Sequence, residues 1–271
     1  MAATCAGSPS SAAAAMTRAE PNTQKGVAMA TITMSEVATP TAAGDRFVAV
    51  ALVALAAVFV ALQVIAGEIT PFWAPPVVVY LLLGLGLLWR APRWLLIVAI
   101  VVPLLQVATG LPFMIPGFTH PETPASFLPE VFIVVGSLTV IAGAIVALRR
   151  TQRSRRPIAI TAGVIAAAAV LTSAVASAGV ASDARQAGDV AVTAANVSYP
   201  ERIEIEQGGA LWVENQDSFR HTFVVEGTNV RAELPGSTAV RVDGDLAPGT
   251  YKFFCDVPGH EEAMQGALYV E

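Results

Sequence analysis

Five long apolar stretches lie between residues 47 and 180, and they restrict the possible folds of this chain more than any other feature. A helix needs about 20 apolar residues to cross a bilayer, and the first, fourth and fifth stretches meet that length. The second and third are shorter and contain prolines, so they are also compatible with a shallow hairpin. The sequence therefore predicts an α-helical transmembrane bundle of about five helices, at residues 47–66, 72–89, 94–110, 130–148 and 158–180.

The composition supports a membrane location for this half of the chain. Charged residues make up only 14% of the sequence, whereas soluble domains contain about 25%. The middles of the five stretches contain no Asp, Glu, Lys, Arg or His. Ion pathways need ionisable groups inside the membrane, and a haem held between helices needs axial ligands there. We therefore interpret the helices as an anchor and scaffold.

The distribution of arginines predicts how the bundle is oriented. The loops between the second and third stretches and between the fourth and fifth are rich in arginine, whereas residues 67–71 and 110–130 contain no Lys or Arg. Because arginine-rich loops stay in the cytoplasm, the N-terminus is expected to be cytoplasmic and the C-terminal region extracytoplasmic. The chain would then be a multi-pass protein of the cell membrane. The arginines concerned are Arg90, Arg93, Arg149, Arg150, Arg153, Arg155 and Arg156.

The two ends of the chain differ from the helical region and from each other. Residues 1–45 are rich in Ala, Ser and Thr without apolar periodicity, which predicts a disordered tail. Residues 181–189 are expected to form a short linker. Residues 190–271 contain short alternating apolar segments separated by turn signals, which are typical of an all-β sandwich or barrel.

The C-terminal region is strongly acidic. Residues 189–271 contain fourteen acids and five bases, a net charge of −9, while the rest of the chain carries +4. Such a charge disfavours nucleic acid and anionic membrane surfaces as partners. It favours a basic or neutral protein partner.

One short segment carries the chemistry. Cys255, His260 and Met264 lie within ten residues between two predicted strands, and His221 comes from a separate strand. Two imidazoles and a thiolate, with a weakly bound thioether, are the donors of blue copper sites. Copper ligation would also explain an unpaired cysteine in a region predicted to be exported, because the other cysteine, Cys5, lies in the tail.

The segment from Tyr251 to Met264 resembles the cupredoxin family. Its Cys-x4-His-x3-Met spacing is closer to azurin and auracyanin than to plastocyanin. The resemblance implies a Greek-key β-sandwich over residues 190–271 and one type 1 copper ion. Its equatorial ligands would be His221, Cys255 and His260, and Met264 would be axial. Family members often have Asn after the first histidine, where this chain has Thr222, whose hydroxyl could still brace the loop.

These features favour a non-enzymatic electron carrier, tethered at the extracytoplasmic face and carrying single electrons. Its expected partners are redox proteins such as a cytochrome or a membrane oxidase or reductase. The alternative is a protein that binds and delivers copper in copper homeostasis. A copper-delivery protein, however, should offer an open coordination position on the metal and further Met or His donors. His120 and Glu122 are candidates for a second metal site, although a solvated loop histidine is the favoured interpretation.

Overall fold

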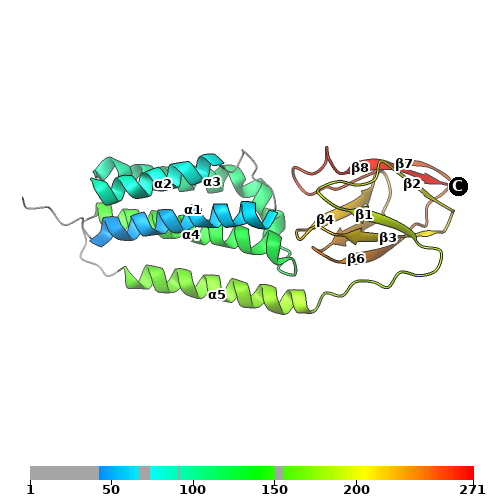
Figure 1. The fold of residues 1–271 in the computed structure, drawn as a ribbon, viewed down its shortest axis with the longest axis horizontal. Helices are drawn as coiled ribbons and strands as arrows, with labels where there is room; N and C mark the ends of the chain where they lie inside the picture. Colours follow the sequence, from blue (N-terminus) through cyan, green and yellow to red (C-terminus); the bar gives the residue numbers. More distant parts are fainter. Residues whose placement is uncertain (1–42, 67–73, 91, 150–154) are drawn as a thin grey trace, which may run out of the picture. The chain divides into compact units, whose positions relative to one another are not determined.

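The computed structural model describes residues 43–66, 74–90, 92–149 and 155–271, in which five helices precede eight strands (Figure 1). Cys5, Arg150, Arg153, most of the predicted tail and the loop at residues 67–71 lie outside the described residues. The helices are α1 (Ala43–Ala66), α2 (Ala74–Trp89), α3 (Arg93–Phe118), α4 (Pro124–Leu148) and α5 (Arg156–Ala178).

Helices α1 to α4 share one apolar core. Helix α1 packs against α2 and α4, and α4 also contacts α3 and α5. The largest buried side chains of this core are Phe59 and Tyr80, whose rings stack with centroids 6.0 Å apart. Helix α5 adds little to the core, because only Ala169 and Ser173 are buried along its length.

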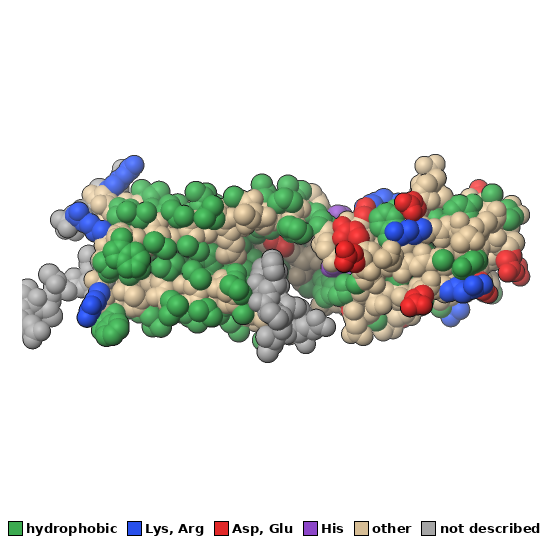
Figure 2. Space-filling model, turned by 90° about the horizontal axis from the view of Figure 1, so that it is seen from above, with side chains coloured by type: hydrophobic (Ala, Val, Ile, Leu, Met, Phe, Trp, Pro, Cys, Tyr) green, Lys and Arg blue, Asp and Glu red, His purple; other side chains and the backbone are tan. Residues whose placement is uncertain are grey.

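Four of the described helices, α1, α3, α4 and α5, are long and apolar enough to cross a membrane, and α2 is a shorter apolar helix of 16 residues. Their outward-facing side chains are largely hydrophobic, as the green surface over the helices in Figure 2 shows. An apolar surface of this extent is stable only against lipid or another apolar surface. The helical half is therefore suited to membrane association.

Helices α3 and α4 are longer than the sequence predicted. Helix α3 continues to Phe118 through Pro103, Pro112 and Pro116, and α4 begins at Pro124. The sequence predicts a kink at Pro103, because a proline inside a helix removes a backbone hydrogen bond. In an apolar environment, however, the helix is the conformation that satisfies most backbone groups, and proline fits well in the first turn of α4. The connection between the helices is reduced to residues 119–123.

The C-terminal region is a β-sandwich, which together with the five helices confirms the predicted fold class. One sheet has the order β1-β3-β6, and the other has the order β2-β8-β7-β4-β5. The pairs β1–β3 and β2–β8 are parallel. The strands are β1 (Val190–Ala194), β2 (Arg202–Ile205), β3 (Ala210–Asn215), β4 (His221–Val225), β5 (Arg231–Leu234), β6 (Ala239–Asp243), β7 (Gly249–Phe254) and β8 (Gln265–Val270).

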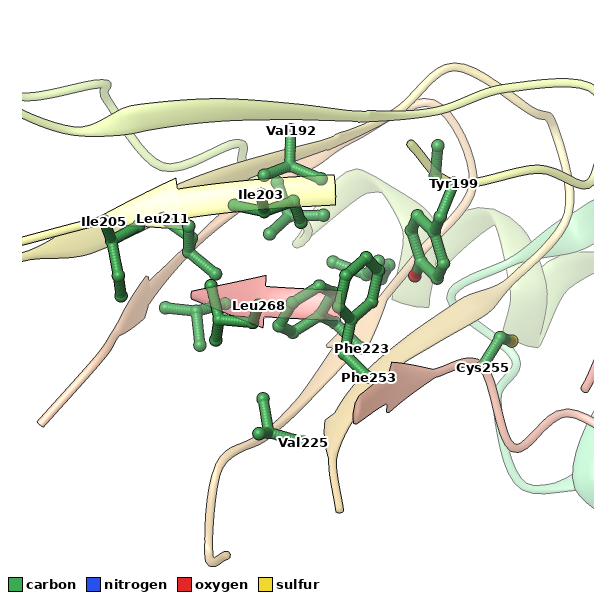
Figure 3. Close-up of a cluster of buried hydrophobic side chains, with 14 of the residues drawn as sticks. Val192, Tyr199, Ile203, Ile205, Leu211, Phe223, Val225, Phe253, Cys255 and Leu268 are labelled. Carbon is green, nitrogen blue, oxygen red and sulfur yellow. The ribbon is translucent and has the colours of Figure 1, made fainter. Parts of the chain in front are cut away.

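Three aromatic residues form the centre of the sandwich core. Phe223 and Phe253 stack with ring centroids 5.0 Å apart, and the ring of Tyr199 meets both edge-on. Figure 3 shows these rings gathered together, with Cys255 to one side of them. The Tyr199 hydroxyl donates a hydrogen bond of 2.7 Å to the backbone oxygen of Thr222. The aromatic cluster thereby supports the strand that carries His221.

Part of the segment predicted as a linker is bonded to the sandwich. The backbone N–H of Asp183 donates to the Ala239 oxygen at 2.9 Å, and the Trp212 indole N–H donates to the Asp183 oxygen at 2.9 Å. Asp189 is buried and forms an ion pair of 3.2 Å with Arg241. These contacts place residues 183–189 along the edge of β6.

Candidate metal centre

Strand pairing brings the predicted ligands to one end of the sandwich. His221 is the first residue of β4, Cys255 directly follows β7, and Met264 directly precedes β8. Strand β7 pairs with both β4 and β8, so the three residues lie at the ends of neighbouring strands. The Cys255 N–H donates to the Met264 oxygen at 2.9 Å and closes the loop that contains His260.

Three donor atoms converge within this loop. The Nδ1 atoms of His221 and His260 are 3.2 Å apart, and the Cys255 Sγ lies 4.0 and 3.8 Å from them, respectively. Given these three sides, the circle through the atoms has a radius of about 2.1 Å and its centre lies inside the triangle. Imidazole and thiolate ligands bind a divalent metal at about 2.0–2.3 Å. The donor set therefore fits a single metal ion with little rearrangement.

Within the described residues, this is the one group of three or more His, Cys, Asp or Glu side chains arranged to hold a metal. Met264 is fully buried in the same core cluster as Cys255, and its N–H donates to the His260 oxygen at 2.8 Å. Its role as axial ligand stays a prediction. His120 instead contacts Glu122, with 2.7 Å between Nδ1 and Oε1, in the turn between α3 and α4.

His221 is fully buried and has a carboxylate partner that the sequence did not indicate. Its Nε2–H donates to Asp217 Oδ2 at 2.8 Å, so its Nδ1 lone pair is free to face Cys255 and His260. Burial lowers the pKa of His221, and Asp217 opposes that shift. The ring is thus held in the tautomer that a metal ion requires.

Burial also shifts the pKa values of the other two donors. Burial, followed by the charge of His221, lowers the pKa of His260 to about 4, so its imidazole is neutral at pH 7. Burial raises the pKa of the Cys255 thiol, although the Thr222 N–H donates to Sγ at 3.4 Å and favours the thiolate. A metal ion bound here must therefore displace the thiol proton. The Phe219 ring meets both imidazoles edge-on, at 5.1 and 5.9 Å between centroids.

Thr222, on β4, braces the loop between β7 and β8 that carries the predicted ligands, which we call the ligand loop. Its Oγ1 accepts the Asp256 N–H at 2.9 Å and donates to Asp256 Oδ1 at 2.8 Å, and Arg231 binds the other carboxylate oxygen of Asp256. The hydroxyl also lies 3.6 Å from Cys255 Sγ. Because the hydroxyl has one hydrogen and donates it to Asp256, the hydrogen bond to the sulfur comes from the backbone N–H of Thr222, at 3.4 Å.

We expect Thr222→Val to loosen the loop without removing a donor atom. Loss of the two hydrogen bonds to Asp256 should lower the free energy of unfolding by about 1–3 kcal/mol and speed copper release. Chelator competition and denaturant titration of the full-length protein measure the two effects. Thr228→Val is the matched control, because Thr228 makes similar local bonds in the β4–β5 turn. Equal copper release from both variants would contradict the bracing role.

One family profile and several solved structures are similar to part of this chain. A family profile described as a cupredoxin-like domain matches residues 163–270. Among solved structures, the chain is similar to auracyanin A, described as a "blue" copper protein from the green thermophilic photosynthetic bacterium Chloroflexus aurantiacus. The identity is 17% over 31% of this chain and 98% of that chain, with a TM-score of 0.27. No curated protein sequence matches.

The C-terminal part of this chain is therefore a cupredoxin-like domain, as the sequence predicted. The profile match begins within α5 and so includes residues that precede the sandwich. The cupredoxin fold and the His221–Cys255–His260 group together support copper binding.

Proposed function

We propose that this chain is a membrane-anchored blue copper protein that carries single electrons. One copper ion would be held by His221, Cys255, His260 and Met264. The observation that carries the proposal is the convergence of two imidazole nitrogens and one sulfur around a point about 2.1 Å from each, a metal–ligand distance. Bound copper would supply a one-electron couple between its +1 and +2 states.

The role of the protein in this function is to fix the positions of the donor atoms. Paired strands position Cys255 and Met264, while Thr222 braces the intervening loop against β4. Soft sulfur favours the reduced ion, and imidazole accepts both oxidation states. A scaffold that resists rearrangement therefore lowers the cost of each electron transfer.

The burial of the donors indicates where electrons would enter and leave. His221 and Cys255 are fully buried, whereas His260 is partly exposed. We infer that the His260 edge is the route for electrons. A site this closed favours electron transfer over substrate turnover and over rapid copper delivery, since both of those need an open coordination position.

We further propose that the helices anchor this domain on the extracytoplasmic side. The positive-inside rule assigns one end of each of α2, α3, α4 and α5 to the cytoplasm. An arginine lies at or beside each of these ends: Arg90, Arg93, Arg149 and Arg156, respectively. The acidic domain would then meet redox partners with a basic or neutral surface, such as a cytochrome or a membrane oxidase or reductase.

Visible absorption and EPR spectroscopy of the purified full-length protein in detergent test the copper assignment. After loading with Cu(II) and removal of excess metal, we expect an intense blue colour from thiolate-to-copper charge transfer, bleached by one electron per chain. A colourless copper complex would contradict the proposal. Rapid loss of copper to a weak chelator would favour the delivery function instead.

A further inference from the structure

The loop that leads into β4 carries a carboxylate that is held in place from two sides. Asp217 accepts the His221 Nε2–H at 2.8 Å through Oδ2. On the opposite side, the N–H of Asn196 donates to Oδ1 at 2.8 Å and the N–H of Val197 donates to Oδ2 at 3.0 Å. The carboxylate therefore links the loop after β1 to the buried imidazole.

The backbone around this carboxylate adopts an unfavourable conformation. Asn196 and Val197 have φ angles of 53° and 54°, in the left-handed region that β-branched residues rarely adopt. Two successive N–H groups in such a turn form a concave binding site for an anion. Here the anion is the side chain of Asp217, which is only 12% exposed. The turn thus fixes the position and the negative charge of the carboxylate.

We propose that Asp217 is a positioning residue that orients His221 for copper and lowers the reduction potential of the site. The inference rests on the proposed copper function. By accepting the Nε2–H, Asp217 keeps the Nδ1 lone pair directed toward the metal position. Its negative charge also increases electron donation through the imidazole, which favours Cu(II) over Cu(I). Arg220, the residue before His221, is paired with Glu233 at 2.7 Å, so its positive charge offsets little of this effect.

The first test compares the reduction potentials of Asp217→Asn and the original protein, both full-length and copper-loaded. Removing the charge should weaken Cu(II) binding relative to Cu(I) at least about tenfold, which raises the potential by about 59 mV for one electron. Asp189→Asn is the matched control. Asp189 is also buried and hydrogen-bonded, but it lies before β1 and its ion-pair partner is Arg241. A potential that shifts no more in Asp217→Asn than in this control would overturn the proposal.

The second test needs neither copper nor a variant. Long-range ¹⁵N–¹H NMR spectra of the metal-free, ¹⁵N-histidine-labelled protein report which ring nitrogen carries the hydrogen. We expect His221 to populate only the Nε2–H tautomer, with a hydrogen protected from exchange by Asp217. A substantial Nδ1–H population would overturn the proposal, even if Asp217→Asn failed to fold. Because this readout is independent of colour, it separates the role of Asp217 from a failure of the blue copper assignment.

Discussion

Replacing Cys255 with serine should abolish the blue colour of the copper-loaded protein completely. The colour of such a site comes from charge transfer between a thiolate and Cu(II), and the serine oxygen cannot supply it. Cys255 Sγ lies 4.0 and 3.8 Å from the two imidazole nitrogens, so the change removes one of three converging donors. Visible and EPR spectra of the full-length variant, loaded in the same way as the original protein, measure the effect.

The chain provides its own control for this experiment. Cys5 is the other cysteine in the sequence, and Cys5→Ser should leave both the colour and the copper content unchanged. A Cys255→Ser variant that stayed blue, or a Cys5→Ser variant that lost its colour, would place the thiolate ligand elsewhere.

The largest stability effect is expected from Phe253→Ala. Phe253 is fully buried and contacts both Phe223 and Tyr199, at 5.0 and 5.7 Å between ring centroids. Truncating a buried Phe costs about 3–5 kcal/mol, because the transfer energy is lost and a cavity remains. That is a large part of the stability of a small domain, which is typically about 5–15 kcal/mol. The measurement is a denaturant titration that follows Trp212 fluorescence, in full-length protein whose other three tryptophans are replaced by Phe.

Phe254 is the matched control for this variant. It is the next residue on β7 and has the same side chain, but it is only partly buried on the opposite face of the sheet. Phe254→Ala should lower the free energy of unfolding by about 1 kcal/mol. Similar losses from the two variants would show that the aromatic cluster does not dominate the stability of the sandwich.

The ligand loop was predictable because its information is local. Cys255, His260 and Met264 lie within ten residues, and a loop of this length between two paired strands brings its ends together. His221 needed more than spacing, since its position depends on the pairing of β4 with β7. The family resemblance indicated His221 as a ligand, and it is the only other histidine between residues 190 and 271. Asp217 had no comparable signal, because its role depends on a turn at residues 196–197, far away in sequence.

The ends of the elements were less predictable than their existence. The five apolar stretches indicated five helices, but α3 continues past its predicted end at residue 110 to Phe118, through Pro112 and Pro116. The short segment before β1 was interpreted as a linker. Its side chains and backbone groups nevertheless pair with β3 and β6, and composition alone does not encode such contacts.

The segment at residues 183–189 also covers a strand edge that would otherwise be free to pair with other copies of the protein. Strand β6 is at the end of its sheet. Along that edge, the Asp183 N–H donates to the Ala239 oxygen, and the Asp183 carboxylate accepts the Arg241 N–H. Bare strand edges recruit further strands and start aggregation. A chain shortened to residues 190–271 would present this edge to its own copies, whereas the intact protein covers the edge with the residues that join the sandwich to α5.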